Sequence, residues 1–272
     1  MFRASSAVHI APGEILKAMH LVGSTIFTVF AACAFGQDGV EHKPDGKNPG
    51  AKSPQVEKDA GGPRSELSSR SPLKLNSMPS RYQFLLNEAI RRFQVRDFKG
   101  ALDYVDRADE ILPPTSWSLN ARGAVAIEQR DFDRGFKYCT DALKVDPDFM
   151  PAKFNLCEIP FLQGNYADAR RLWGQLFSMI RPGDSRSELL TYRIYLTFLL
   201  ERDFGHAKEW LDKLPFPSQT PAYQYAHAAW ARQNGDLAKW DEWLRSAAFI
   251  WPESKRGEFV DVLIQLGWMK RE

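Results

Sequence analysis

The chain has 272 residues, enough for one or two domains, and 44% of them are hydrophobic. It has 36 basic and 34 acidic residues, so the net charge of +2 gives no electrostatic case for binding nucleic acid or an acidic membrane. The three cysteines and five histidines do not have the spacing of a zinc site, and the sequence contains no nucleotide-binding or nucleophile motif. The sequence therefore predicts no metal, no cofactor and no catalytic residues.

The first 36 residues have the pattern of an export signal or membrane anchor. Lys17 and His20 precede an apolar run at 21–35, which has about the length of a signal-peptide core and is short for a spanning helix of roughly 20 residues. Small residues at 32–34 and 34–36 fit cleavage sites. Three alternatives remain open: a cleaved signal, a retained anchor, and a lipoprotein modified at Cys33, which ends the stretch FAAC. Each predicts an exported protein, periplasmic or secreted, and the last two tether it to a membrane.

The next segment, 37–79, contains no aromatic residue but six prolines and five glycines. Such a composition cannot bury enough apolar surface to offset the entropy lost on ordering the backbone. The sequence therefore predicts a disordered Pro/Gly-rich linker between the export signal and the rest of the chain.

From residue 80 onward a short phrase recurs five times. It consists of an Asp or Asn, a large apolar residue, two further residues and usually a small residue. The small residue or its counterpart lies at positions 101, 135, 169, 207 and 240, so the steps are 34, 34, 38 and 33 residues. A repeat of this period is typical of a helical solenoid. The phrases begin at Asp97, Asp131, Asn165, Asp203 and Asp236.

Each unit is expected to be a helical hairpin whose two helices approach closely at small side chains. The Asp or Asn of each phrase can cap the second helix by accepting a backbone N–H. Tyr195 and Trp240 are large residues at positions where the other units have smaller ones. The packing positions of the five units are Ala89, Ala101 and Ala108; Gly123, Gly135 and Ala142; Cys157, Ala169 and Leu176; Tyr195, Ala207 and Leu214; and Ala228, Trp240 and Ala247.

This pattern resembles the tetratricopeptide repeat (TPR), with its 34-residue period, small packing residues, aromatic residue at the turn and terminal proline. The second unit, with Gly123, Phe132, Gly135, Ala142 and Pro147, matches most closely. The resemblance implies that 80–272 is an all-α domain, a right-handed α-solenoid of about five TPR-like hairpins. An amphipathic segment at 258–264 is expected to form a C-terminal capping helix over the last repeat.

The resemblance also implies a function, because the first helices of such repeats line a concave groove that binds a peptide or protein segment. A non-enzymatic protein-binding module of the cell envelope is expected. A structural or assembly scaffold, possibly self-associating, and an enzyme with an unrecognised site are the alternatives, and the oligomeric state is open. On the resemblance, the candidate partner-binding residues are Asn120, Asn155, Tyr192, Arg193 and Tyr225.

Two cysteines lie in the repeat region. Cys157 occupies a packing position, and Cys139 lies seven residues after the turn residue Phe132. They are expected to be buried thiols that behave as small hydrophobic residues. The alternative is a disulfide between the second and third hairpins, which export would permit and geometry would decide.

Overall fold

The computed structural model describes residues 74–181 and 183–270. Within them every regular element is helical, which confirms the predicted all-α class. The elements are the short 3-10 helix η1 (Leu75–Ser77) and the α-helices α3 (Ser80–Gln94), α4 (Phe98–Asp109), α5 (Ser116–Glu128), α6 (Phe132–Val145), α7 (Met150–Leu162), α8 (Tyr166–Met179), α9 (Arg186–Leu200), α10 (Phe204–Leu211), α11 (Ala222–Gln233), α12 (Leu237–Ile250) and α13 (Glu253–Gln265).

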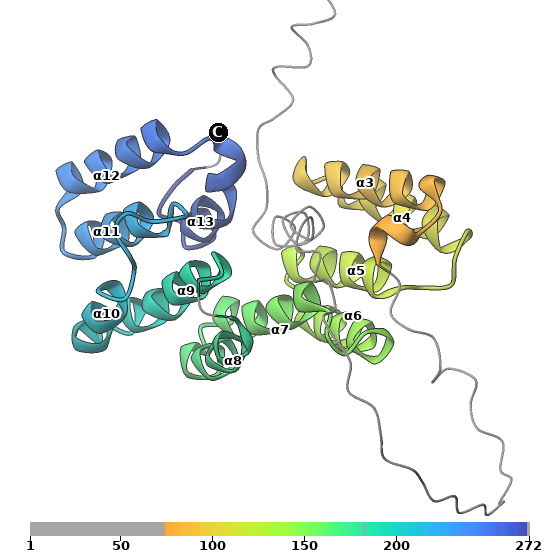
Figure 1. The fold of residues 1–272 in the computed structure, drawn as a ribbon, viewed down its shortest axis with the longest axis horizontal. Coiled ribbons are helices and arrows are strands. Elements are labelled where there is room, and N and C mark those ends of the chain that lie inside the picture. Colours follow the sequence, from red (N-terminus) through yellow and green to blue (C-terminus); the bar gives the residue numbers. More distant parts are fainter. Residues whose placement is uncertain (1–73, 182, 271–272) are drawn as a thin grey trace, which may run out of the picture.

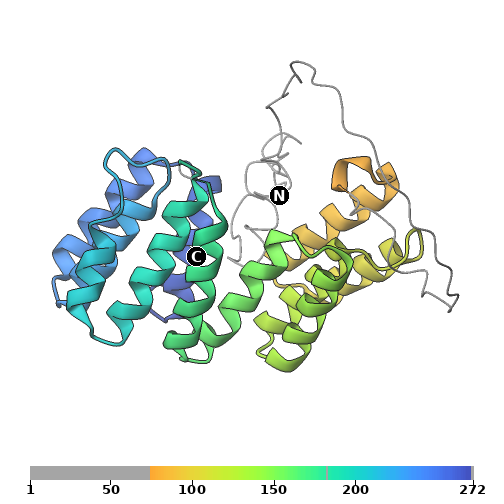
Figure 2. The ribbon, with the colours of Figure 1, turned by 60° about the horizontal axis from the view of Figure 1, so that its bottom comes forward.

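Ten of these helices form five hairpins, in which α3 packs on α4, α5 on α6, α7 on α8, α9 on α10 and α11 on α12. The second helix of each hairpin also contacts the first helix of the next hairpin. The hairpins follow one another in a curved row, with α13 on the inner side of the curve (Figure 1). In a second view the helices of successive hairpins lie alongside one another along the row (Figure 2). First helices α3 and α5, α5 and α7, and α9 and α11 contact each other directly and form an inner layer.

The turn inside each hairpin has the same geometry in all five units. The residue before the phrase has a left-handed backbone, with φ between 61° and 78°. The backbone N–H of this residue and that of the next residue donate hydrogen bonds to carbonyls in the last turn of the first helix. In the second hairpin, Arg130 donates to Ile127 and Asp131 donates to Ala126. The side chain of the Asp or Asn then accepts the backbone N–H three residues later, which confirms the predicted caps. The left-handed residues are Arg96, Arg130, Gly164, Arg202 and Gly235.

All fifteen predicted packing positions are buried. The helices of the second hairpin approach closely: a Cβ added at Gly123 would lie 2.7 Å from the Cys139 Sγ, and one at Gly135 would lie 2.6 Å from the Ile127 Cγ1. Only glycine therefore allows these two helices to come so close without moving a neighbour. In the fourth unit the equivalent position is Tyr195, whose hydroxyl donates to the carbonyl of Ala226 on α11 at 2.9 Å.

The apolar interior consists of two clusters that meet at α7. The first extends from Met78 to Ile159, and the second from Phe154 to Leu263. Because α7 contributes apolar residues to both, it has almost no polar side, and its sequence MPAKFNLCEIPFL is apolar around most of the helix.

Both cysteines are buried and free, so the alternative of a disulfide between them is wrong. Cys139 belongs to the first apolar cluster and faces Gly123, whereas Cys157 belongs to the second and donates to the Lys153 carbonyl on its own helix. Burial raises the pKa of the Cys139 thiol to about 12 and also raises that of Cys157. Both thiols therefore stay protonated at neutral pH, as expected of inert core residues.

The described structure begins before the predicted domain boundary at residue 80. Helix η1 lies within the last part of the predicted linker, and Met78 is buried in the first apolar cluster. The export signal, Cys33 and linker residues 37–73 lie outside the described residues.

The fourth hairpin differs most from the others. Its second helix, α10, has only eight residues and is followed by a loop over 212–221 that leads to α11. The buried carboxylate of Glu188 on α9 organises this loop by accepting hydrogen bonds from Ser218 Oγ, Gln219 N–H and Thr220 N–H at 2.7, 3.0 and 3.0 Å. The loop is therefore held against α9 by one carboxylate.

Candidate partner-binding groove

The inner face of α9 and α11, which the sequence analysis assigned to a partner, is covered by α13. The predicted C-terminal helix exists, and it contacts the last hairpin through α11 and α12, as a capping helix does. It also reaches back to α9 through Phe259, which packs against Tyr192. Gln265, at its end, donates to Glu128 at the end of α5 at 3.5 Å. α13 therefore extends beyond the last repeat and lies across the inner layer.

Two of the five predicted residues donate hydrogen bonds to the main chain of α13. The Tyr192 hydroxyl donates to the Phe259 carbonyl, and Nη2 of Arg193 donates to the Glu258 carbonyl, each at 3.3 Å. Both side chains are fully buried. Because carbonyl oxygens occur in every peptide, these contacts recognise a polypeptide segment without depending on its side chains.

The same surface holds one aromatic side chain of α13 between two tyrosines. The Phe259 ring lies 5.5 Å from the Tyr192 ring and 6.2 Å from the Tyr225 ring, and it is nearly parallel to the latter. These separations are those of favourable aromatic pairs, worth about 0.5–1.5 kcal/mol each beyond the area buried. Tyr192, Arg193 and Tyr225 are together called the α13 seat below.

The other two predicted residues, Asn120 on α5 and Asn155 on α7, are interior residues that bond each other. The Asn155 amide donates to the Asn120 carbonyl oxygen at 2.9 Å, and both residues are fully buried. This neutral bond joins neighbouring first helices. The structure thus brings the five predicted residues onto one layer but buries all of them, and their contact with a partner remains a prediction.

A buried ion pair joins α7 to α9. Oε1 of Glu158 lies 3.4 Å from Nε of Arg193, and neither side chain is exposed. Burial raises the pKa of Glu158, although the positive charge of Arg193 opposes that rise. The Arg193 guanidinium also lies 5.9 Å from the centre of the Phe154 ring. Sequence analysis missed Glu158, because an acid at a helix position among apolar residues carries no spacing signal of its own.

Several buried polar atoms around the α13 seat have no hydrogen-bond partner among the described residues. They include both carboxylate oxygens of Glu158, the Nε and Nη1 of Arg193, the Nε of Arg256 and the Oε1 of Gln265. An unpaired buried polar group costs roughly 1–3 kcal/mol. The seat of α13 is therefore well packed with apolar groups but poorly paired in its polar contacts.

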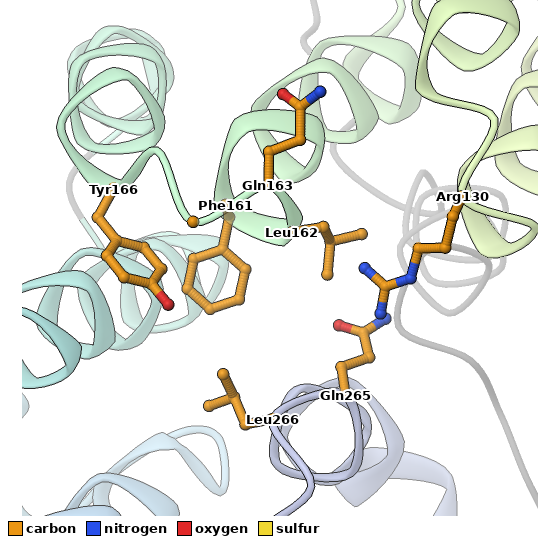
Figure 3. Close-up of a pocket in the computed structure, with 8 residues that line it drawn as sticks. Arg130, Phe161, Leu162, Gln163, Tyr166, Gln265 and Leu266 are labelled. Atoms are coloured by element: carbon orange, nitrogen blue, oxygen red, sulfur yellow. The ribbon is translucent and has the colours of Figure 1, made fainter.

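An open cavity of about 300 Å³ lies where the end of α13 approaches the turns of the second and third hairpins (Figure 3). The Arg130 and Gln265 side chains meet on one side, Phe161 and Tyr166 lie on the other, and Leu162 and Leu266 point into the space between them (Figure 3). Gln163 and Gly164 complete the lining. This cavity places the Arg130 guanidinium and the Gln265 amide next to apolar groups, whereas the Gln163 side chain points away from it.

No cluster of three or more His, Cys, Asp or Glu residues that could hold a metal ion is found in 74–181 and 183–270. In the same part of the chain, no helix combines the length and apolar character needed to cross a membrane. Comparison with protein-family models, with curated proteins and with solved structures gives no match for this chain.

Proposed function

We propose that residues 80–270 form a right-handed α-solenoid of TPR-like hairpins, and that the protein is a non-enzymatic module that binds a peptide or protein segment on its inner face. The repeated turn geometry and the fifteen buried packing positions support the repeat assignment. The observation that carries the function is that the inner face already holds a polypeptide segment, α13, through the main-chain contacts of Tyr192 and Arg193.

Capture experiments with the full chain test this proposal. Arg130 and Gln163 line the open cavity, and both are exposed, so replacing them with alanine leaves the packed interior intact. We expect wild-type protein to capture a partner from envelope extract and the Arg130→Ala/Gln163→Ala variant to capture less of it. A matched control is Lys137→Ala/Lys144→Ala, whose lysines are exposed on α6 and do not line that cavity. Capture by none of the three proteins contradicts the proposal, whereas equal capture by all three shows that the partner does not depend on this cavity.

The site of action is proposed from the amino-terminal pattern. An apolar run at 21–35 followed by small residues supports export to the periplasm or beyond, with a membrane tether if the run is retained or Cys33 is lipidated. The mass of the mature amino terminus distinguishes the three forms. A mature protein that begins at Met1 and fractionates with the cytosol contradicts export.

A self-associating scaffold is the second candidate, and one feature favours it. Phe249 near the end of α12 is 92% exposed, and Ile250 and Leu237 on the same helix are also exposed. Phe249 and Ile250 are adjacent in the chain, and contiguous exposed apolar groups are typical of interaction surfaces. Light scattering of wild type and of a Phe249→Ser/Ile250→Ser variant tests this candidate, since a stable oligomer formed only by wild type would favour it.

A further inference from the structure

The proposed function leaves open what class of segment the inner face binds, and α13 gives the answer. Its contacts with the α13 seat include one aromatic side chain and two main-chain carbonyls, and Val262 and Leu263 of the same helix are fully buried. The spacing of 259, 262 and 263 corresponds to one face of a helix. The seat is therefore shaped for an amphipathic helix with an aromatic residue at its centre.

The connection and composition of α13 are consistent with its replacement on the inner face by another segment. Only Trp251 and Pro252 separate it from α12, so α13 is joined to the last hairpin by a short connection and is the last helix of the described residues. Its interior contains Gly257, which disfavours a helix by roughly 0.5–1 kcal/mol relative to alanine. A 13-residue helix of this kind is marginal by itself in water, so it forms because it is docked.

The unpaired polar atoms at the seat make the docking of α13 weaker than its apolar contacts suggest. Glu158 Oε1 and Arg193 Nε are 3.4 Å apart as an ion pair but form no hydrogen bond, and Glu158 Oε2 and Arg193 Nη1 also have no hydrogen-bond partner among the described residues. A buried ion pair repays its desolvation only when its remaining lone pairs and protons are satisfied. A competing segment that bonds these atoms would thus be favoured over α13.

We propose that α13 is an exchangeable occupant of the inner face, and that the partner is an amphipathic helical segment with an aromatic side chain that takes the place of Phe259 between Tyr192 and Tyr225. This inference rests on the proposed binding function and specifies its ligand class. Because the competent state is the one with α13 released, the apparent affinity for a partner is reduced by the fraction of molecules in which the seat is free.

The test uses the full chain and a labelled synthetic peptide of residues 253–270 as the probe. Phe259→Ala in the full chain weakens α13 but leaves the seat unchanged. We expect this variant to bind the peptide at least about tenfold more tightly than wild type, since the seat is free in more molecules. Ile264→Ala is the matched control, because it also shortens an apolar side chain of α13 but lies outside both apolar clusters. It should bind as weakly as wild type, and a peptide carrying Phe259→Ala should not bind.

Hydrogen exchange of the wild-type protein provides a measurement that does not depend on any variant folding. We expect α13 amides to exchange faster than those of α9, and added peptide to speed the exchange of α13 further while α9 stays protected. Exchange of α13 only together with α9, or peptide binding to Phe259→Ala no tighter than to wild type, overturns the inference. A dimer that forms by trading α13 between two copies, detected by light scattering, also overturns it.

The outcome is separable from that of the proposed function. If a captured partner binds wild type and Phe259→Ala equally, α13 is not its competitor, and the binding function stands without this inference. If the peptide exchanges with α13 but no partner is captured, the exchangeable seat stands and the proposed function fails.

Discussion

The two halves of the molecule are joined by different chemistry, although they are built from the same repeat. In the first half, α3 to α7, the helices meet at alanines and glycines, and neighbouring first helices are linked by the neutral Asn120–Asn155 bond. In the second half, α7 to α13, two of the packing positions hold bulky aromatic residues, Tyr195 and Trp240. There the joint between first helices is the buried Glu158–Arg193 ion pair.

The difference shows how a repeat array acquires a specialised region. In the first half, small residues let the helices pack closely, and the hydrogen bond between the first helices α5 and α7 is neutral. Aromatic and charged groups leave an apolar surface and poorly paired polar atoms, and in this chain both lie beneath α13. The irregular second half is therefore where we expect binding, and the regular first half is expected to act mainly as support.

The largest predicted difference between the halves is the loss in the free energy of unfolding when the bond between neighbouring first helices is removed. Arg193→Met leaves the Glu158 carboxylate buried without its partner, and we expect a loss of about 3–5 kcal/mol in the free energy of unfolding. Asn155→Leu in the first half removes a neutral bond and should cost about 1–3 kcal/mol. Urea denaturation measures both.

The double variant Glu158→Leu/Arg193→Met is the control for this pair, because it removes both charges together. It should recover most of the stability lost in the single variant. A single Arg193→Met variant that is as stable as Asn155→Leu would contradict the contrast between the two joints.

The pH dependence of stability should also be specific to the second half. Burial raises the pKa of Glu258 from its ordinary value of 4.5 to about 7, and Arg193 on α9, which itself pairs with Glu158 on α7, opposes this rise. Between these values the folded protein binds more protons than the unfolded chain, so stability is full below about pH 4.5 and falls as the pH rises to about 7. The shift corresponds to at most about 3 kcal/mol.

The raised pKa of Glu158 acts in the same direction. Hydrogen exchange of α13 at pH 5 and pH 8 checks the prediction, since α13 should open more readily at pH 8. Glu258→Gln cannot ionise and should flatten the dependence. An α13 that is better protected at pH 8 in wild type would show that the sign is wrong.

The close packing of the first half gives the next prediction. A methyl group at position 123 would meet the Cys139 Sγ at 2.7 Å, so Gly123→Ala should cost about 1–3 kcal/mol through overpacking. Gly174 on α8 has no heavy atom within 4 Å of such a methyl group, and Gly174→Ala should stabilise by about 0.5–1 kcal/mol. Thermal or urea denaturation of both variants tests the contrast, and effects of the same sign would contradict it.

A gain in stability of similar size is expected at the hairpin turns. Arg202 is exposed and has a left-handed backbone with φ of 61°, which costs a non-glycine residue roughly 1–2 kcal/mol. Arg202→Gly should therefore stabilise the protein by about 1 kcal/mol. Arg96→Gly in the first half should gain less, because Arg96 also pairs with Glu128 at 2.8 Å. A gain at Arg96 that equals or exceeds the gain at Arg202 would show that the ion pair contributes nothing.

The sequence by itself determined the local structure of the described domain. The recurring Asp or Asn gave the five caps, and the fifteen packing positions identified the buried faces, because capping and helix-helix approach depend on residues a few positions apart. The five candidate residues Asn120, Asn155, Tyr192, Arg193 and Tyr225, chosen on the family resemblance, all lie buried on first helices, and their contact with a partner remains a prediction.

Only the tertiary structure showed that α13 covers Tyr192, Arg193 and Tyr225. The contacts of Phe259 with Tyr192 and of Glu258 with Arg193 join residues 65–67 positions apart in the chain, and no repeat pattern predicts them. The same holds for the pairing of Glu158 with Arg193 across two hairpins and for the separation of Cys139 from Cys157. Periodicity predicts which face each helix buries. The curvature of the row and the path of α13 depend instead on contacts between residues far apart in the sequence, which a local pattern does not encode.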